Sequence, residues 1–203
     1  MVLWLFKKLI LITIIFNSYA FADEVSPIVL NTKKEFDVDS RSLEIYQDHS
    51  GKLNIEDILK RSNDFKKNNK RVLGFGFSKA TIWIKLPIKN KSLIKDWVLT
   101  INFPDLDELN LYKKRNGVWV QSYAGDTIST KKWEFLHKDY AFSIDREGTY
   151  YLSVKSRGAL SIPLKLMTKK TFLDLKIKGH YFYGGFFSIL AFCIIYNLIM
   201  ALF

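Results

Sequence analysis

Much of the chain between residues 81 and 167 alternates apolar and polar side chains with a period of two, and this pattern decides the fold class. The segment "TIWIKLPIK" (81–89) places Ile82 and Ile84 on one face and Trp83 and Lys85 on the other. Successive side chains of a β-strand point to opposite sides of a sheet, so such a segment forms a strand with one face in a core. The pattern recurs in "WVLTINF", "DELNLYK", "VWVQSY", "DYAFSID", "TYYLSVKS" and "SIPLKLM". The sequence predicts an all-β domain of antiparallel sheets packed as a sandwich.

Turn and cap residues divide these segments. Asn116-Gly117 lies between two of them and is the strongest short hairpin signal. "AGDT", "DREGT" and "SRGA" are further turn candidates. A short helix is predicted at "NIEDILKRS" (54–62), with Asn54 as its N-cap. Pro87 has no N–H to donate, so we expect its strand to lie at a sheet edge or to contain a bulge there.

The two ends of the chain are hydrophobic in different ways. Residues 1–22 contain Lys7 and Lys8, a short apolar run and a small-x-small ending at Ala22, which predicts a secretory signal peptide; an uncleaved anchor is the alternative. Residues 181–203 carry no charge over 23 residues, enough for a helix to cross a bilayer. Between them we expect an N-terminal extension (23–40), the β-sandwich (41–168) and a juxtamembrane linker (169–180).

Composition indicates an exported domain. The only cysteine, Cys193, lies in the hydrophobic tail, so no disulfide can form within the chain, which favours a bacterial periplasm. The formal net charge is +11, but the lysines are spread along the whole sequence. Because no basic block alternates with aromatic residues, nucleic acid is excluded as a partner.

The order of these segments resembles a known family. "LEIYQDHSGKLNIEDIL", "GFGFSKATIWIKLPIKN", "DWVLTINFPDLDELNLYKKRNGVW" and the blocks up to "SIPLKL" follow one another before an apolar helix with a Tyr196-Asn197 pair. This series is similar to the type-2 extracellular domain of bacterial seven-transmembrane receptors with diverse intracellular signalling modules. The resemblance implies a jelly-roll-like sandwich akin to carbohydrate-binding modules, in the periplasm, followed by the first helix of a seven-helix bundle in the inner membrane. The other helices and the cytoplasmic output module, commonly a histidine kinase or a diguanylate cyclase, are then missing, so we expect a fragment or a truncated product.

Aromatic and basic residues on the polar side of the strands are the candidate ligand-binding groups. Sugar recognition needs flat aromatic surfaces flanked by hydrogen-bonding groups. The candidates are Trp83, Lys85, Trp119, Tyr123, Trp133, Tyr151, Lys155 and Arg157. Trp83 leads them, because the family strand carries an aromatic residue followed two positions later by a base; here that base is Lys85 rather than the usual Arg. Alternatively, these rings cover a second hydrophobic layer, and Asp105 and Asp107 either form turns or are ion-pair partners for such bases.

Catalysis, metals and cofactors are not predicted. The three histidines are isolated, and nothing in the sequence places two carboxylates across a cleft or forms a nucleophile motif. The sequence predicts a ligand-sensing receptor ectodomain for a carbohydrate or another small molecule. The alternatives are an ectodomain that binds a periplasmic protein or a second copy of itself, and a membrane-tethered carbohydrate-binding module without signalling.

Overall fold

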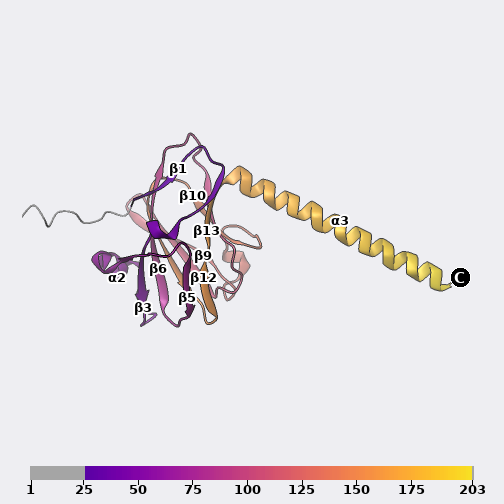
Figure 1. Cartoon of the computed structure of the whole chain (residues 1–203), viewed down its shortest axis with the longest axis horizontal. Coiled ribbons are helices and arrows are strands. Elements are labelled where there is room, and N and C mark those ends of the chain that lie inside the picture. The colour runs from indigo at the N-terminus through magenta and orange to yellow at the C-terminus, as the bar shows by residue number, and fades with distance from the viewer. Residues whose placement is uncertain (1–25, 203) are drawn as a thin grey trace, which may run out of the picture.

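The computed structural model describes residues 26–202, in which a β-sandwich precedes one long helix (Figure 1). The predicted signal peptide lies outside the described residues. The strands are β1 (Ile28–Leu30), β2 (Glu35–Asp37), β3 (Glu44–Asp48), β4 (Lys66–Lys67), β5 (Leu73–Phe77), β6 (Thr81–Asn90), β7 (Trp97–Ile101), β8 (Glu108–Arg115), β9 (Val118–Ala124), β10 (Tyr140–Ile144), β11 (Gly148–Lys155), β12 (Ala159–Ile162) and β13 (Leu164–Thr168). The helices are α2 (Ile55–Lys60) and α3 (Lys169–Leu202), with 3-10 turns at Ser40–Ser42, Ser62–Asp64 and Thr130–Lys132.

Two sheets pack face to face and a strand pair extends them. The large sheet has the order β4-β3-β6-β11-β8-β9, with β1 paired in parallel to the far end of β6. The small sheet has the order β10-β7-β13-β2, and β12 pairs with β5. Apart from β1, the strand pairs are antiparallel. The predicted all-β sandwich is confirmed; the jelly-roll connectivity remains a prediction.

The core between the sheets comes from the aliphatic side of the alternation. Ile82, Ile84 and Leu152 of the large sheet, and Leu99 and Phe142 of the small sheet, are fully buried there. The prediction fails on β9, where Val118 and Val120 are exposed. β9 is the last strand of the large sheet, and Val118 and Val120 stand opposite Arg115 and Lys113 of β8 rather than opposite apolar core residues.

Pro87 lies in an interior strand, so the expected edge position is wrong. On one side β6 pairs with β11 along its whole middle, and Pro87 stands opposite Thr149. On the other side β3 pairs with residues 81–85 and β1 with residues 88–90, so positions 86 and 87 fall between two partners. A residue that cannot donate a backbone hydrogen bond fits this interruption.

The hairpin and the short helix form as predicted. Asn116 and Gly117 have φ angles of 49° and 85°, the left-handed values that a two-residue hairpin turn needs. Asn54 caps α2, since its side chain accepts from the N–H of Asp57 while the Asp57 carboxylate accepts from the N–H of Asn54. Both local signals therefore act through side-chain and backbone chemistry close in the sequence.

α3 is a continuous helix of 34 residues that includes the predicted juxtamembrane linker. It is long and apolar enough to cross a membrane, and none of its apolar stretch is buried against the sandwich. Only its first turns pack, through Phe172, against the outer side of the small sheet. Figure 1 shows the rest of the helix leaving the sandwich as a free rod.

Candidate functional site

The strand register places most of the predicted ligand-binding residues on the outer face of the large sheet. On β6, Trp83 and Lys85 point away from the core-facing Ile82 and Ile84. Tyr151 stands opposite Lys85 in β11, and Tyr112 stands opposite Tyr151 in β8. The alternation in the sequence therefore gives the orientation of this face correctly.

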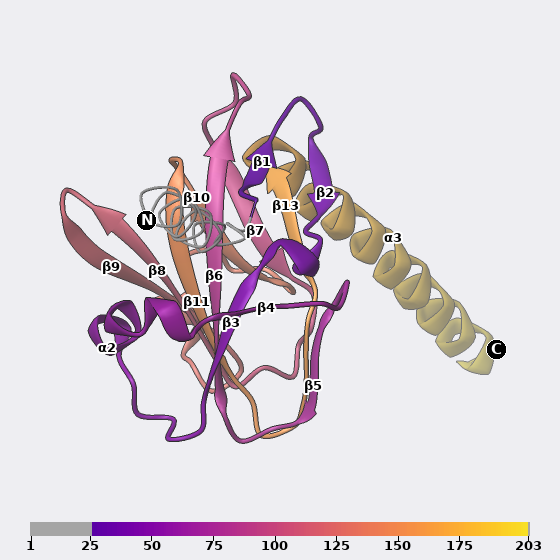
Figure 2. The same ribbon diagram turned by 60° about the vertical axis from the view of Figure 1, so that its left-hand side comes forward.

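Much of that face is covered by the chain's own segment 53–65, which contains α2. Ile58 and Phe65 are buried against Trp83 and Tyr151 in a second hydrophobic cluster, and Figure 2 shows α2 lying in front of the large sheet. Trp83 is 1% exposed and stacks on Tyr112 with ring centroids 5.4 Å apart. The expectation that Trp83 offers an open aromatic platform is wrong, and the alternative of a second hydrophobic layer is correct.

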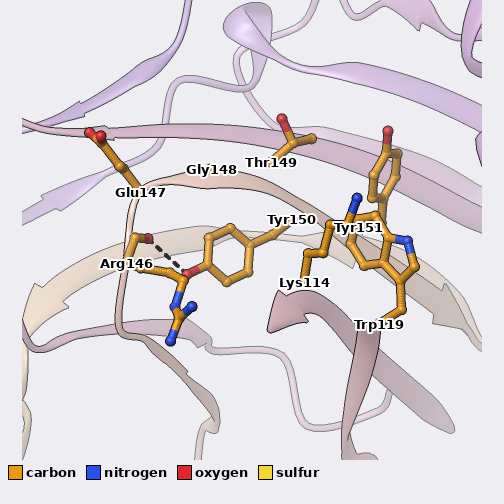
Figure 3. A pocket seen from close by; sticks show the side chains of 8 residues that line it. All are labelled: Lys114, Trp119, Arg146, Glu147, Gly148, Thr149, Tyr150 and Tyr151. Carbon is orange, nitrogen blue, oxygen red and sulfur yellow. Dashed lines mark hydrogen bonds between the residues drawn. The ribbon is translucent and has the colours of Figure 1, made fainter. Parts of the chain in front are cut away.

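Beyond the edge of this cover, the outer face forms a hollow of about 270 Å³ (Figure 3). Trp119 of β9 and Tyr151 of β11 meet edge to face there, with centroids 5.5 Å apart. The Lys114 side chain runs beside these two rings, and Arg146 and Glu147 stand at the opposite end. The site thus combines aromatic surface with charges of both signs, the combination that binds a polar ring.

The two loops that form the hollow are joined by an ion pair. Arg115, before the β8–β9 hairpin turn, pairs with Asp145, which begins the β10–β11 turn. Burial alone would raise the pKa of the Asp145 carboxyl, but the hydrogen bond and charge of Arg115 outweigh it and lower the pKa. Asp145 therefore stays ionised at neutral pH and keeps Arg146 and Glu147 beside the hairpin.

The tyrosines of the site are neutral hydrogen-bonding groups. Burial raises the pKa of Tyr150 to about 12, and its hydroxyl donates to the carbonyl of Arg146 over 2.8 Å. Burial likewise raises the pKa of Tyr151. Neither phenol ionises near neutral pH, so the negative charge lining the hollow comes from Glu147.

Two other predicted bases already have carboxylate partners. Lys85 donates to Glu44 over 2.6 Å in a half-buried ion pair. Arg157 is exposed and contacts Asp107, which also accepts from the Arg157 backbone N–H over 2.6 Å. The expected pairing of Asp107 with a base is therefore confirmed. Arg157 follows β11, whereas the hollow lies at the start of β11, so Arg157 is not part of it.

The remaining predicted residues lie at the end of the large sheet away from the hollow or off that sheet. Lys155 is exposed at the end of β11, opposite Glu108. Tyr123, near the end of β9, forms a bridge with Trp133. Trp133 packs edge to face on Tyr140 at 5.3 Å and belongs to the main core's margin. Of the eight candidates, the hollow brings together Trp119 and Tyr151.

Three polar residues of the hollow, Lys114, Arg146 and Glu147, are not among the predicted ligand-binding residues. Lys114 shares the outward alternation of Tyr112 on β8, a signal that could have found it. Arg146 and Glu147 stand in "DREGT", which was interpreted as a turn only. Among residues 26–202 there is no group of three or more His, Cys, Asp or Glu that could hold a metal ion.

The fold and the apolar helix together define a class: a β-sandwich ectodomain joined to a candidate membrane span. Within that class, the family model 7TMR-DISM extracellular 2 matches residues 40–168, and the chain belongs to this family. The resemblance seen in the sequence is confirmed. The family consists of extracellular sensing domains of receptors and is not a known enzyme family. No curated protein matches the chain.

Proposed function

We propose that the chain is the periplasmic ligand-sensing head of a bacterial inner-membrane receptor, and that the hollow beside Trp119 and Tyr151 binds its ligand. The observation that carries this proposal is the hollow beside the half-buried Trp119 and the Tyr151 ring, which is flanked by Lys114 and Arg146. Its volume is at the small end of the range of ligand pockets, roughly 300 Å³. It suits a single hydroxylated ring, so a monosaccharide or a similar small molecule is the ligand.

The position of the hollow also supports a route to the helix. The turn that carries Arg146 and Glu147 connects β11 of the large sheet directly to β10 of the small sheet. Ala141 of β10 is buried with Phe172 of α3 in one cluster. A ligand that changes the position of this turn would therefore move β10 against the first turns of α3, which is the coupling that sensing requires.

A thermal-shift screen of the full chain in detergent tests the proposal. Monosaccharides, sugar acids, organic acids and peptidoglycan fragments are the probes. A ligand at one hundred times its Kd stabilises the folded state by about 2.7 kcal/mol. We expect a dose-dependent rise in Tm for one class, and we expect Lys114→Gln and Trp119→Ala to reduce that rise relative to each variant's own ligand-free Tm.

Lys155→Gln is the matched control, because Lys155 is exposed on the same sheet face at the other end of β11. It should leave the ligand-induced rise unchanged. Equal losses in Lys114→Gln and Lys155→Gln would show that the hollow is not the site. Absence of any shift across the library would contradict a small-molecule ligand.

A protein partner is the second candidate function, and one surface favours it. Phe77 of β5 is 86% exposed, and Val72 just before β5 is also exposed. Exposed aromatic side chains such as Phe77 are frequent anchors of protein interfaces. Phe77→Ser should abolish capture of such a partner while leaving ligand binding at the hollow intact.

A further inference from the structure

A second hollow, of about 530 Å³, lies between α3 and the segment that precedes β10. Leu136 and Lys138 line it from that segment, and Leu175, Lys176 and Tyr183 line it from α3. The ligand hollow lies on the outer face of the large sheet, whereas this one lies where the helix leaves the small sheet. We call it the junction groove.

Aromatic contacts hold the two walls of the junction groove together. The Phe172 ring packs edge to face on Phe135 at 5.2 Å and against the His137 ring at 4.8 Å. Phe172 is 2% exposed, so the helix is docked at this point. The groove is therefore formed before any ligand arrives, which lowers the cost of binding.

The walls are apolar and open. Leu136 is 66% exposed and Leu175 is 47% exposed, although both stand next to a well-packed aromatic contact. An apolar surface of this kind beside a candidate membrane span suits an acyl chain better than water. Tyr183 continues the groove into the uncharged part of α3.

The charges beside these walls are mainly positive. Lys138 and Lys176 both line the groove, and both act on the His137 imidazole, whose pKa burial lowers. Asp139 partly offsets them through its contact with Lys138 at 3.1 Å. Glu134, two positions before Leu136, contacts the buried Lys113 at 3.6 Å. The groove therefore favours an anion.

The position of Lys176 along α3 corresponds to the headgroup layer of a bilayer. Tyr183 lies seven positions after Lys176, which is about 10 Å along a helix. The headgroup layer is several Å thick outside the hydrocarbon core. If the uncharged stretch from residue 181 onward fills the hydrocarbon, Lys176 lies at the level of the phosphates.

We propose that the junction groove binds an anionic phospholipid, with its phosphate at Lys138 and Lys176, its glycerol backbone against Leu136 and Leu175, and an acyl chain that runs past Tyr183 toward the bilayer core. Bilayer lipid is the source we infer, because the groove runs into the apolar stretch of α3 and a soluble phosphate would leave its apolar walls exposed. The inference rests on α3 entering a membrane, as in the proposed function, but it does not depend on the ligand hollow. A bound lipid would fix the sandwich relative to the membrane surface.

Native mass spectrometry of the full chain in detergent, with added phosphatidylglycerol or phosphatidylcholine, tests this inference. We expect the wild type to retain phosphatidylglycerol in preference to phosphatidylcholine. The double variant Lys138→Gln, Lys176→Gln should lose that retention by about tenfold or more, because each basic residue near a lipid surface contributes several-fold to binding. Lys52→Gln, Lys155→Gln is the control of equal charge change, because both lysines are exposed and line neither hollow, and it should behave as the wild type.

Two further measurements distinguish a bound lipid from a soluble anion in the junction groove. Leu136→Ser should weaken phosphatidylglycerol retention, whereas soluble glycerol phosphate should not compete with the lipid. Competition by glycerol phosphate would replace the lipid with a soluble anion and overturn the inference. Equal loss in the control variant, equal retention of both lipids, or a dimer that excludes lipid would also overturn it. Ligand-induced thermal shifts at the first hollow would persist in each of those cases, so the two proposals fail separately.

Discussion

The two sheets of the sandwich have outer faces that are both covered, but by segments with different purposes. The large sheet is covered by residues 53–65, which begin and end within the domain and bury Trp83 and Tyr151. The small sheet is covered by the segment before β10 and by Phe172, the first large residue of the helix that leaves the domain. One cover completes the fold, and the other joins the fold to the membrane.

The difference between the two covers explains where hollows remain on the outer faces of the sheets. Trp119 packs at the margin of the cluster under the cover of the large sheet, and a hollow stays open beside it. The cover on the small sheet is itself the helix contact, so the groove beside it lies next to the span. The β10–β11 turn connects a strand of the small sheet directly to a strand of the large sheet.

The largest expected effect is the loss of Trp83. Trp83→Ala removes a fully buried indole from the cover of the large sheet, and such truncations cost about 3–5 kcal/mol. Thermal or denaturant unfolding of the full chain should show a destabilised sandwich. A variant with unchanged stability would mean that the cover is loose and that Trp83 belongs to an open binding face.

Phe172→Ala tests the other cover and should cost less, about 2–3 kcal/mol, because the cluster it leaves is smaller and faces an exposed helix. Hydrogen exchange should rise in residues 169–178 while the core strands stay protected. The exposed neighbour Leu173 is the control, and Leu173→Ala should change little. Simultaneous loss of protection in β6 and β11 would contradict two separate covers.

Local sequence signals predicted most of the fold because their physical causes are local. The alternation over 81–89 fixes which side chains of β6 face the core, Asn116-Gly117 fixes a hairpin, and Asn54 fixes the start of α2. Orientation depends on the strand alone. The exposure of a side chain depends on more than its strand, since Trp83 is outward-facing and is still buried by residues 18 or more positions away.

The site was harder to predict for the same reason. Trp119 and Tyr151 were named correctly as residues of one face, but their meeting depends on the strand order β6-β11-β8-β9. Arg146 and Glu147 reach the hollow through a turn held by the Arg115–Asp145 pair, a contact across 30 positions. Alternation contains no information about strand order or turn placement, so the polar half of the hollow was missed.

Asp48 allows a pH test of the cover on the large sheet, because its carboxylate organises the turn that leads to residues 53–65. Its buried carboxylate accepts from the backbone and hydroxyl of Ser50 and from the N–H of Leu53. Burial alone would raise its pKa, but these hydrogen bonds outweigh burial and lower the pKa. Asp48→Asn loses one carboxylate oxygen and should cost about 1–2 kcal/mol at neutral pH.

The sign of the pH dependence follows from the lowered pKa. A carboxyl whose folded pKa lies below its unfolded value of about 3.9 contributes stability above that value, and the contribution disappears as pH falls through the folded pKa. The difference in unfolding free energy between wild type and Asp48→Asn should therefore be constant from pH 7 to about 5 and shrink below pH 4. A difference that grows in acid would contradict the assigned role.

The smallest effect is expected at the uncovered far end of the large sheet. Arg157 is exposed and its pair with Asp107 lies in solvent, where such pairs contribute about 0–1 kcal/mol. Arg157→Ala should hardly change Tm and should leave ligand-induced stabilisation intact, because the hollow lies at the opposite end of β11. If Arg157→Ala instead abolished ligand binding while Lys114→Gln did not, the binding face would lie at this end of the sheet. The margin of the α2 cover would then have no part in recognition, and the contrast between the two covers would concern stability alone.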